Sequence, residues 1–231
     1  MPQKQFMLDE QTPITIYKRR ASRSLRLSIA ADGQVRVSIP AWAPYKSGLD
    51  FALSRRPWID ANQRQALVLT HGQAIGKAHH LNFVVEPINA PQSRVLANEI
   101  IVKHPADLST GDPAVQAKAR DAGVRALRSQ AQGLLPQRLA MLAERDGFEY
   151  TSVRIKQLKS RWGSCDQQAN ITLNLFLMQL PWDCIDYVLL HELTHTKILR
   201  HGPDFWREME AVLPNVKQVR KQLRNHQPVL S

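Results

Sequence analysis

The sequence predicts an α+β protein in which a β-rich N-terminal part and a helical segment precede a C-terminal core, where one helix packs beside a small antiparallel sheet. Alternating apolar and polar residues predict strands before residue 40 and again after residue 150. Apolar residues at helical spacing predict helices over residues 114–145 and after residue 181. We therefore expect two parts, residues 1–110 and residues 111–231, which could pack as one unit.

The first part begins with strands. Two are expected within residues 14–39, joined at the Asp32-Gly33 turn signal. A helical pattern follows from Gly48 to about Leu69, and Pro57 could split it because proline removes a helical hydrogen bond. Two short strands complete this part, at Leu81–Val85 and Ile100–Val102.

The second part begins with a long helix. Asp112-Pro113 is a helix-start signal, and the helical composition continues to about Arg145, after which Gly147 ends the helix. Pro136 is expected to kink this helix or to divide it in two. Two alternating strands are expected next, at Val153–Leu158 and Ile171–Leu177.

The last segment predicts an amphipathic helix. Its apolar residues recur at helical spacing, at Val212, Val216, Val219 and Leu223. Its other face is basic, with Lys217, Arg220, Lys221 and Arg224. We expect that basic face to be solvated.

The composition is that of a globular protein with a basic surface. Hydrophobic residues make up 43% of the 231 residues, and no run of eighteen apolar residues predicts a membrane span. The first ten residues lack the charged start and apolar core of a secretory signal, so a cytoplasmic location is expected. The formal charge of +11 could attract nucleic acid, nucleotides or an acidic protein, although a basic, soluble surface also explains it.

The cysteine content argues against sulfur-based stabilisation. Cys165 and Cys184 form no Cys-x-x-Cys pair. Neither a disulfide framework nor a thiolate zinc site is therefore expected.

One helical segment carries a metal-binding pattern, His191-Glu192-Leu193-Thr194-His195. Residues four apart lie on one face of a helix, about 6 Å apart along its axis, so both imidazoles can reach one ion. The neighbouring Glu192 points at the same cavity and can act as general base on a metal-bound water. This is the His-Glu-x-x-His (HExxH) pattern of zinc hydrolases.

A third ligand is expected from His201, which precedes Gly202-Pro203, a turn followed by another helix. Three protein ligands and one water give the open geometry of a catalytic zinc. Glu208 and Glu210 are rival ligands whose alternative role is a solvated helix face. One zinc ion is the expected cofactor, although Mn, Ni or Co fits similar ligands.

Several segments of the chain form a recognisable set. They are Arg161-Trp162-Gly163-Ser164-Cys165, Ile171-Thr172-Leu173-Asn174, the run from Asp186 to His195, His201, and Phe205-Trp206. An earlier set comprises Ser24-Leu25-Arg26-Leu27, Gly33-Gln34-Val35, Val37-Ser38-Ile39-Pro40 and Trp58-Ile59. Together these segments resemble the YgjP-like metallopeptidase family, small bacterial relatives of the SprT-like and WLM zinc proteins. The close match covers about residues 150–225, and the likeness spans most of the chain.

This resemblance implies a zincin-like core, a single zinc and a hydrolase. By position it makes His191, His195 and His201 the zinc ligands and Glu192 the catalytic residue. Metzincins share the histidine spacing but have glycine where this chain has Ile198, and no Met-turn is identifiable here. A secreted protease of the metzincin type is therefore disfavoured.

The sequence specifies no substrate contacts. The candidates are Asn174, Tyr187 and Arg161, each with a structural alternative. Tyr187 lies one turn before the first histidine and could donate a hydrogen bond to an oxyanion, or could be a buried structural tyrosine. Asp186 and Asp204 could orient an imidazole N–H, or could cap a helix or face solvent.

The expected function is a zinc-dependent hydrolase acting on a peptide or protein. In the favoured reaction, Glu192 takes a proton from water and delivers it to the leaving amine. Two alternatives stay open: hydrolysis of a non-peptide substrate such as a nucleotide phosphoanhydride, and a nucleic-acid-associated protease of the SprT-like kind.

Overall fold

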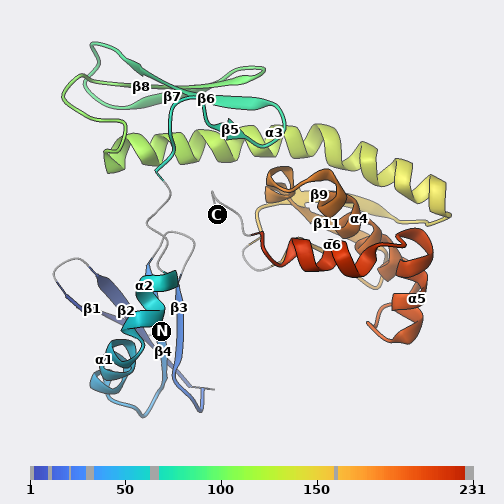
Figure 1. Cartoon of the computed structure of the whole chain (residues 1–231), viewed down its shortest axis with the longest axis horizontal. Coiled ribbons are helices and arrows are strands. Elements are labelled where there is room, and N and C mark those ends of the chain that lie inside the picture. The colour runs from blue at the N-terminus through green and yellow to red at the C-terminus, as the bar shows by residue number, and fades with distance from the viewer. Residues whose placement is uncertain are drawn as a thin grey trace. The chain divides into compact units, whose positions relative to one another are not determined.

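The computed structural model describes residues 3–9, 12–20, 22–29, 34–62, 68–158 and 161–226 (Figure 1). Its contacts divide the chain into two compact units, Met1–Val68 and Leu69–Ser231. The sequence led us to place the division at residue 110. The difference arises because residues between 69 and 110 form a sheet that packs on the long helix of the second unit.

The first unit contains a four-stranded sheet. Its strands are β1 (Gln3–Met7), β2 (Pro13–Arg19), β3 (Arg26–Ile29) and β4 (Val35–Pro40), in the order β1-β2-β4-β3. Strands β2 and β4 pair in parallel, because β3 lies between them in sequence but at the edge in space. Three strands therefore occupy the region where two were expected. The Asp32-Gly33 turn signal lies outside the described residues.

Two short helices pack on this sheet, α1 (Tyr45–Ser54) and α2 (Arg56–Asn62). The helical pattern is divided at Arg55, just before Pro57, and residues 63–67 lie outside the described part. A Cβ on Gly48 would lie 2.9 Å from Ile16 and 3.0 Å from Ile39, so the glycine lets α1 approach the sheet closely. The core of the unit consists of Ile14, Ile16, Val35, Val37, Ile39, Ala43, Ala52 and Ile59.

The second unit is built on one helix, α3 (Pro113–Asp146), which is 34 residues long. Asp112 caps its first turn by accepting a hydrogen bond from the N–H of Ala114, and Gly147 ends it in the left-handed conformation, as predicted. The helix is continuous through Pro136, so the expected division into two helices is wrong. Packing along much of its length outweighs the one hydrogen bond that proline removes.

A sheet covers the first half of α3 (Figure 1). Its strands are β5 (Ala74–Ile75), β6 (His79–Val85), β7 (Gln92–Val95) and β8 (Glu99–His104), in the order β5-β6-β8-β7. Two buried glutamines of α3 fasten the segment that enters this sheet. Gln116 exchanges hydrogen bonds with the N–H and C=O of Leu69, and Gln130 donates to the C=O of Ile75.

A smaller sheet lies near the second half of α3. It comprises β9 (Ser152–Lys156), β10 (Gly163–Cys165) and β11 (Asn170–Asn174), in the order β10-β11-β9. The prediction of an antiparallel sheet is correct only for β10 and β11, because β9 pairs with β11 in parallel. The chain crosses from one edge of the sheet to the other between β9 and β10, so the sheet is mixed.

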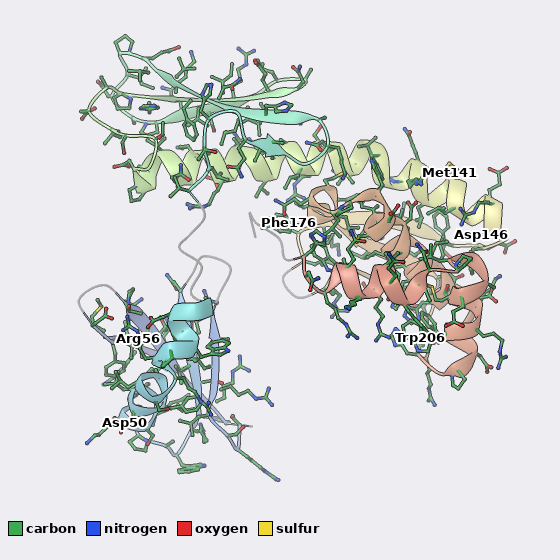
Figure 2. The ribbon with its side chains drawn as sticks, in the orientation of Figure 1. Asp50, Arg56, Met141, Asp146, Phe176 and Trp206 are labelled. Atoms are coloured by element: carbon green, nitrogen blue, oxygen red, sulfur yellow. The ribbon has the colours of Figure 1, made fainter. Side chains whose placement is uncertain are left out.

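The strand expected at Ile171–Leu177 ends early. Asn174 accepts a hydrogen bond from the N–H of Phe176 and so caps a short 3₁₀ helix, η1 (Leu175–Gln179). Every residue from Leu175 to Met178 is buried. The segment therefore turns apolar side chains to the core on all its sides, whereas the strand that was predicted would bury only every second residue. Phe176 is among the largest fully buried side chains (Figure 2).

Three helices complete the unit: α4 (Trp182–Lys197), α5 (Pro203–Val212) and α6 (Val216–Leu223). Helix α4 packs against α3, β10, α5 and α6 and so occupies the centre of this core. No helix in the described part of the chain is long and apolar enough to cross a membrane.

Candidate metal centre

Helix α4 presents two of its histidines one turn apart. Its buried side chains, including Ile185 and Leu189, hold the helix against the core and so fix the direction of the imidazoles. The Nδ1 atom of His195 lies 3.0 Å from the carbonyl oxygen of Ile198. This contact makes Nδ1 the donor, which leaves the lone pair of Nε2 available to another partner.

His201 reaches this pair because the chain turns back directly after α4. Ile198 ends the helix in an extended conformation, and the N–H of Gly202 donates to the carbonyl of Arg200 at 2.8 Å. Pro203 then starts α5, where its lack of an N–H costs nothing. The Gly202-Pro203 signal thus indicated correctly where the chain turns.

The three Nε2 atoms form a small triangle. His191 and His195 are separated by 3.2 Å, His195 and His201 by 3.1 Å, and His201 and His191 by 3.0 Å. Two nitrogens on one tetrahedral zinc, with bonds of about 2.05 Å, stand about 3.3 Å apart. The imidazoles therefore have the spacing of ligands that share one ion.

The rival ligands lie elsewhere. Among the described residues, the group able to hold a metal ion consists of the three histidines alone. Glu208 pairs with Lys197 at 3.1 Å, and Glu210 pairs with Lys217 at 2.9 Å. The cysteine Cys165 is also outside the group.

The chemistry of the three imidazoles favours a cation between them. A neutral imidazole has one N–H, so three mutually close Nε2 atoms cannot all satisfy one another with hydrogen bonds. Burial lowers the pKa of His191 to about 3, helped by repulsion from the other two imidazoles and from Arg220. Burial also lowers the pKa of His195. Both rings are therefore neutral at physiological pH, which is the form that binds metals.

The two aspartates considered as partners for an imidazole N–H are engaged elsewhere. Asp186 accepts two hydrogen bonds from Arg138, at 2.8 and 2.6 Å, and Asp204 pairs with Arg207 at 3.0 Å. Within the described part of the chain, Nδ1 of His191 is buried and has no hydrogen-bond partner. The orientation of this ring therefore depends on packing.

Glu192 is buried, with 5% of its surface exposed, and it faces β10. A Cβ on Gly163 would lie 2.7 Å from its Oε1 and 2.8 Å from its Cγ, so the strand passes directly over the carboxyl group. Burial raises the pKa of Glu192 to about 8, against the opposing charge of Arg161. A cation among the histidines would favour the ionised form of this carboxyl group.

Two aromatic side chains of α5 line the histidine cluster. The ring of Phe205 is buried and its centroid lies 4.6–4.9 Å from those of all three imidazoles. Trp206 stacks on His201 at 6.0 Å, centroid to centroid, with an interplanar angle of 29°. Sequence reasoning assigned these residues no role. Their position in the first turn after Gly202-Pro203, which points the chain back at His201, was a usable signal.

The three candidates for substrate contacts differ in their surroundings. Asn174 is buried and donates to the carbonyls of Leu158 and Arg161, both at 2.9 Å, so it organises the approach to β10. Tyr187 is buried with its ring centroid 5.9 Å from that of His191, and burial raises the pKa of its hydroxyl. Arg161 is exposed and acts on Glu192 through its charge.

Comparison with known proteins gives a family match over most of the chain. The family model described as "YgjP-like, metallopeptidase domain" matches residues 23–226. Crystal structures of two metallopeptidase zymogens show a partial likeness. Abylysin of Pyrococcus abyssi is 28% identical, with a TM-score of 0.37 over 40% of this chain and 93% of that one. Jannalysin of Methanocaldococcus jannaschii is 19% identical, with a TM-score of 0.36 over 39% and 94%. No curated protein matches the chain.

Proposed function

The chain belongs to the YgjP-like metallopeptidase family, and from this premise we propose that it is a zinc-dependent peptidase in which Glu192 activates the attacking water. The observation that carries the proposal is the triangle of Nε2 atoms, 3.0–3.2 Å on each side, next to a buried carboxyl group. His191, His195 and His201 would hold one zinc ion. When bound, the ion would lower the pKa of a coordinated water towards 7 and polarise the scissile carbonyl.

The protein's own groups supply the proton transfers. Glu192 takes a proton from the attacking water and delivers it to the amine that leaves. Its carboxyl group is held on one side by α4 and on the other by the backbone at Gly163, so its position is fixed before substrate binds. The positive charge of Arg161 favours the ionised carboxylate that this role requires.

An edge strand next to the histidine helix can hold the substrate. Strand β10 pairs with β11 on one side, and it packs against α4. An extended peptide added along the other side of β10 would gain main-chain hydrogen bonds and would pass the metal centre. Main-chain hydrogen bonds of this kind do not depend on the amino-acid sequence of the peptide. Side-chain pockets near the centre must then supply the specificity.

The experiment compares wild type with Glu192→Gln. The variant keeps the size of the side chain but removes the base, so kcat should fall by about 10²- to 10⁴-fold while one zinc per chain remains bound. Glu144→Gln, an exposed glutamate of α3, is the matched control and should leave kcat unchanged. Retained zinc with full turnover in Glu192→Gln would rule out the proposed role.

A second series tests the ligands. His201→Ala should reduce both zinc content and turnover, because two imidazoles and water bind zinc less tightly than three imidazoles. His80→Ala, an exposed histidine of β6, should change neither. The same preparations, assayed with nucleotides, would detect the release of phosphate that the alternative hydrolase predicts.

A further inference from the structure

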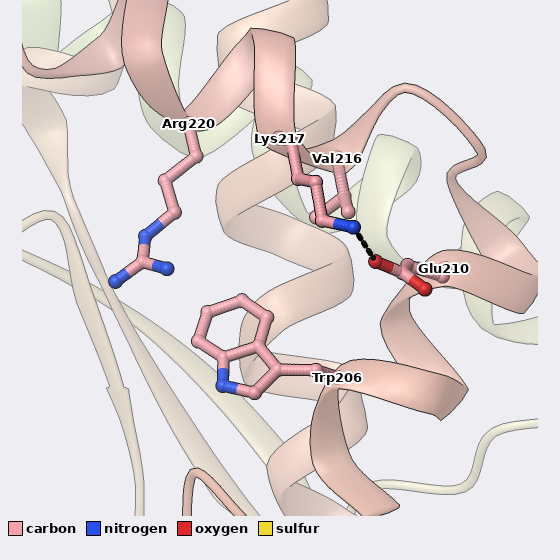
Figure 3. Close-up of a pocket in the computed structure, with 5 residues that line it drawn as sticks. All are labelled: Trp206, Glu210, Val216, Lys217 and Arg220. Atoms are coloured by element: carbon pink, nitrogen blue, oxygen red, sulfur yellow. Dashed lines mark ion pairs between the residues drawn. The ribbon is translucent and has the colours of Figure 1, made fainter. Parts of the chain in front are cut away.

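A pocket of about 250 Å³ opens between α5 and α6, and its lining combines apolar and charged side chains. Trp206 and Glu210 come from α5, and Val216, Lys217 and Arg220 from α6 (Figure 3). Most of the exposed lining is apolar. An apolar lining strengthens the electrostatic effect of any charge placed against it.

The charges in this pocket are not equivalent. Lys217 and Glu210 pair with each other at 2.9 Å, so their charges largely cancel (Figure 3). The guanidinium of Arg220 lies 4.5 Å from the centroid of the Trp206 ring, and no carboxylate in the described part of the chain forms an ion pair with it. The basic face of α6 is exposed, as the sequence predicted, and one of its arginines also contacts an aromatic ring.

This pocket adjoins the metal centre. The indole of Trp206, which contacts Arg220, also stacks on His201 and lies 6.4 Å from His191, centroid to centroid. A ligand group that reaches Arg220 would thus sit within a few residues of a peptide bond held at the histidines.

We propose that Arg220 and Trp206 form a substrate subsite that binds a carboxylate, so that the peptidase prefers a substrate with one negative charge close to the scissile bond. The proposal rests on the proposed function and names its substrate class. A guanidinium presents a planar fork of N–H donors that matches a carboxylate, and the contact of Arg220 with the indole of Trp206 restricts the position of that fork. The aliphatic part of an acidic residue can pack against the half-buried indole of Trp206.

Two sources can supply this carboxylate: an acidic side chain, or the C-terminus of a short peptide. Two series of fluorogenic peptides with a neutral core distinguish them. In the first, the C-terminus is amidated and a single Glu or Gln occupies each position in turn. In the second, all side chains are neutral and a free C-terminus lies at increasing distances from the scissile bond.

Wild type should cleave the best acidic or free-acid peptide about 10- to 100-fold more efficiently than its neutral counterpart, as expected for a charge-assisted hydrogen bond. In Arg220→Gln this ratio should fall to about one, and Arg220→Lys should lie between because it keeps the charge but loses the fork. Lys221→Gln, an exposed neighbour on α6 outside the pocket, should retain the full ratio.

Binding provides a readout that does not depend on turnover. Labelled peptides of both series are titrated by fluorescence anisotropy into Glu192→Gln protein, with and without Arg220→Gln. Circular dichroism and zinc content verify that each variant is folded and loaded. The expected result is tighter binding of the acidic peptide that disappears with Arg220→Gln.

Two results overturn the subsite: equal cleavage and binding of acidic and neutral peptides, or a charge preference that survives Arg220→Gln. If wild type cleaves no peptide, the proposed function fails, and the binding series alone decides. Carboxylate-dependent binding that requires Arg220 would still support the subsite.

Discussion

Replacing Gly163 by alanine tests whether the contact between β10 and α4 fixes the carboxyl group of Glu192. The added Cβ would lie 2.7 Å from Oε1, 2.8 Å from Cγ and 3.0 Å from Cδ, where ordinary contacts begin near 3.4 Å. The φ angle of Gly163 is not in the left-handed region, so alanine adds a clash without backbone strain. Relief of the clash requires a shift of about 0.5–1 Å in the carboxylate or the strand.

A shift of this size should be costly for catalysis and tolerable for the fold. Misplacement of a catalytic group by about 1 Å can lower the rate by about 10²-fold. Overpacking costs about 1–3 kcal/mol, which lowers Tm by roughly 2–12 °C in a protein of this length. We therefore expect kcat to fall about 100-fold while zinc content stays at that of wild type.

The assay is kcat on a fluorogenic peptide, with zinc content and Tm measured on the same preparation. Gly133→Ala is the matched control, because a Cβ there meets nothing within 4 Å and alanine favours the helix. A kcat within about twofold of wild type in Gly163→Ala would refute the reasoning, since the carboxylate would then not depend on this contact.

Three further changes test other parts of the molecule. Removal of the metal with a chelator should abolish turnover and lower Tm, since a ligand at about 1,000 times its Kd stabilises the folded protein by about 4 kcal/mol. Added zinc should restore both turnover and Tm. Full activity in the chelated protein would contradict the zinc centre. Gly76→Ala should lower Tm by roughly 5–15 °C, because φ is +70° and the Cβ would collide with Gln130 and, at 2.7 Å, with Leu127. A calorimetric Tm within about 2 °C of wild type would show that the collision is relieved at no cost. Asp186→Asn should lower the free energy of unfolding in urea by only about 1 kcal/mol, because the partly exposed ion pair with Arg138 is screened by water. A loss of zinc in this variant would show instead that Asp186 acts on the metal centre.

The sequence allowed the prediction of features that depend on short stretches of chain. His191 and His195 share a face because a helix returns to the same side every four residues, and Gly202-Pro203 indicates where the chain reverses. The two ends of α3 were predicted for the same reason, since Asp112 and Gly147 act on adjacent backbone groups. The resemblance to the YgjP-like family is confirmed by the family match.

Features that depend on distant stretches of chain were missed. The parallel pairing of β9 with β11 follows from the crossover before β10, for which no local residue pattern exists. The position of Arg220 over Trp206 depends on how α6 docks, and a basic helix face has the same sequence whether or not an indole lies beneath it. The contact of Gly163 with Glu192 likewise joins segments about thirty residues apart, and a glycine in a turn-like segment did not indicate it.

The two buried glutamines of α3 determine where the polypeptide could be truncated without exposing its core. Gln116 and Gln130 satisfy the backbone of Leu69 and Ile75, and the side chains between the two glutamines, Ala119, Ala122 and Ala126, lie in the core under the sheet formed by β5 to β8. A recombinant fragment starting near residue 111 would expose this apolar stripe to water and should aggregate. A fragment starting at Leu69 keeps the sheet over this stripe and should remain monodisperse.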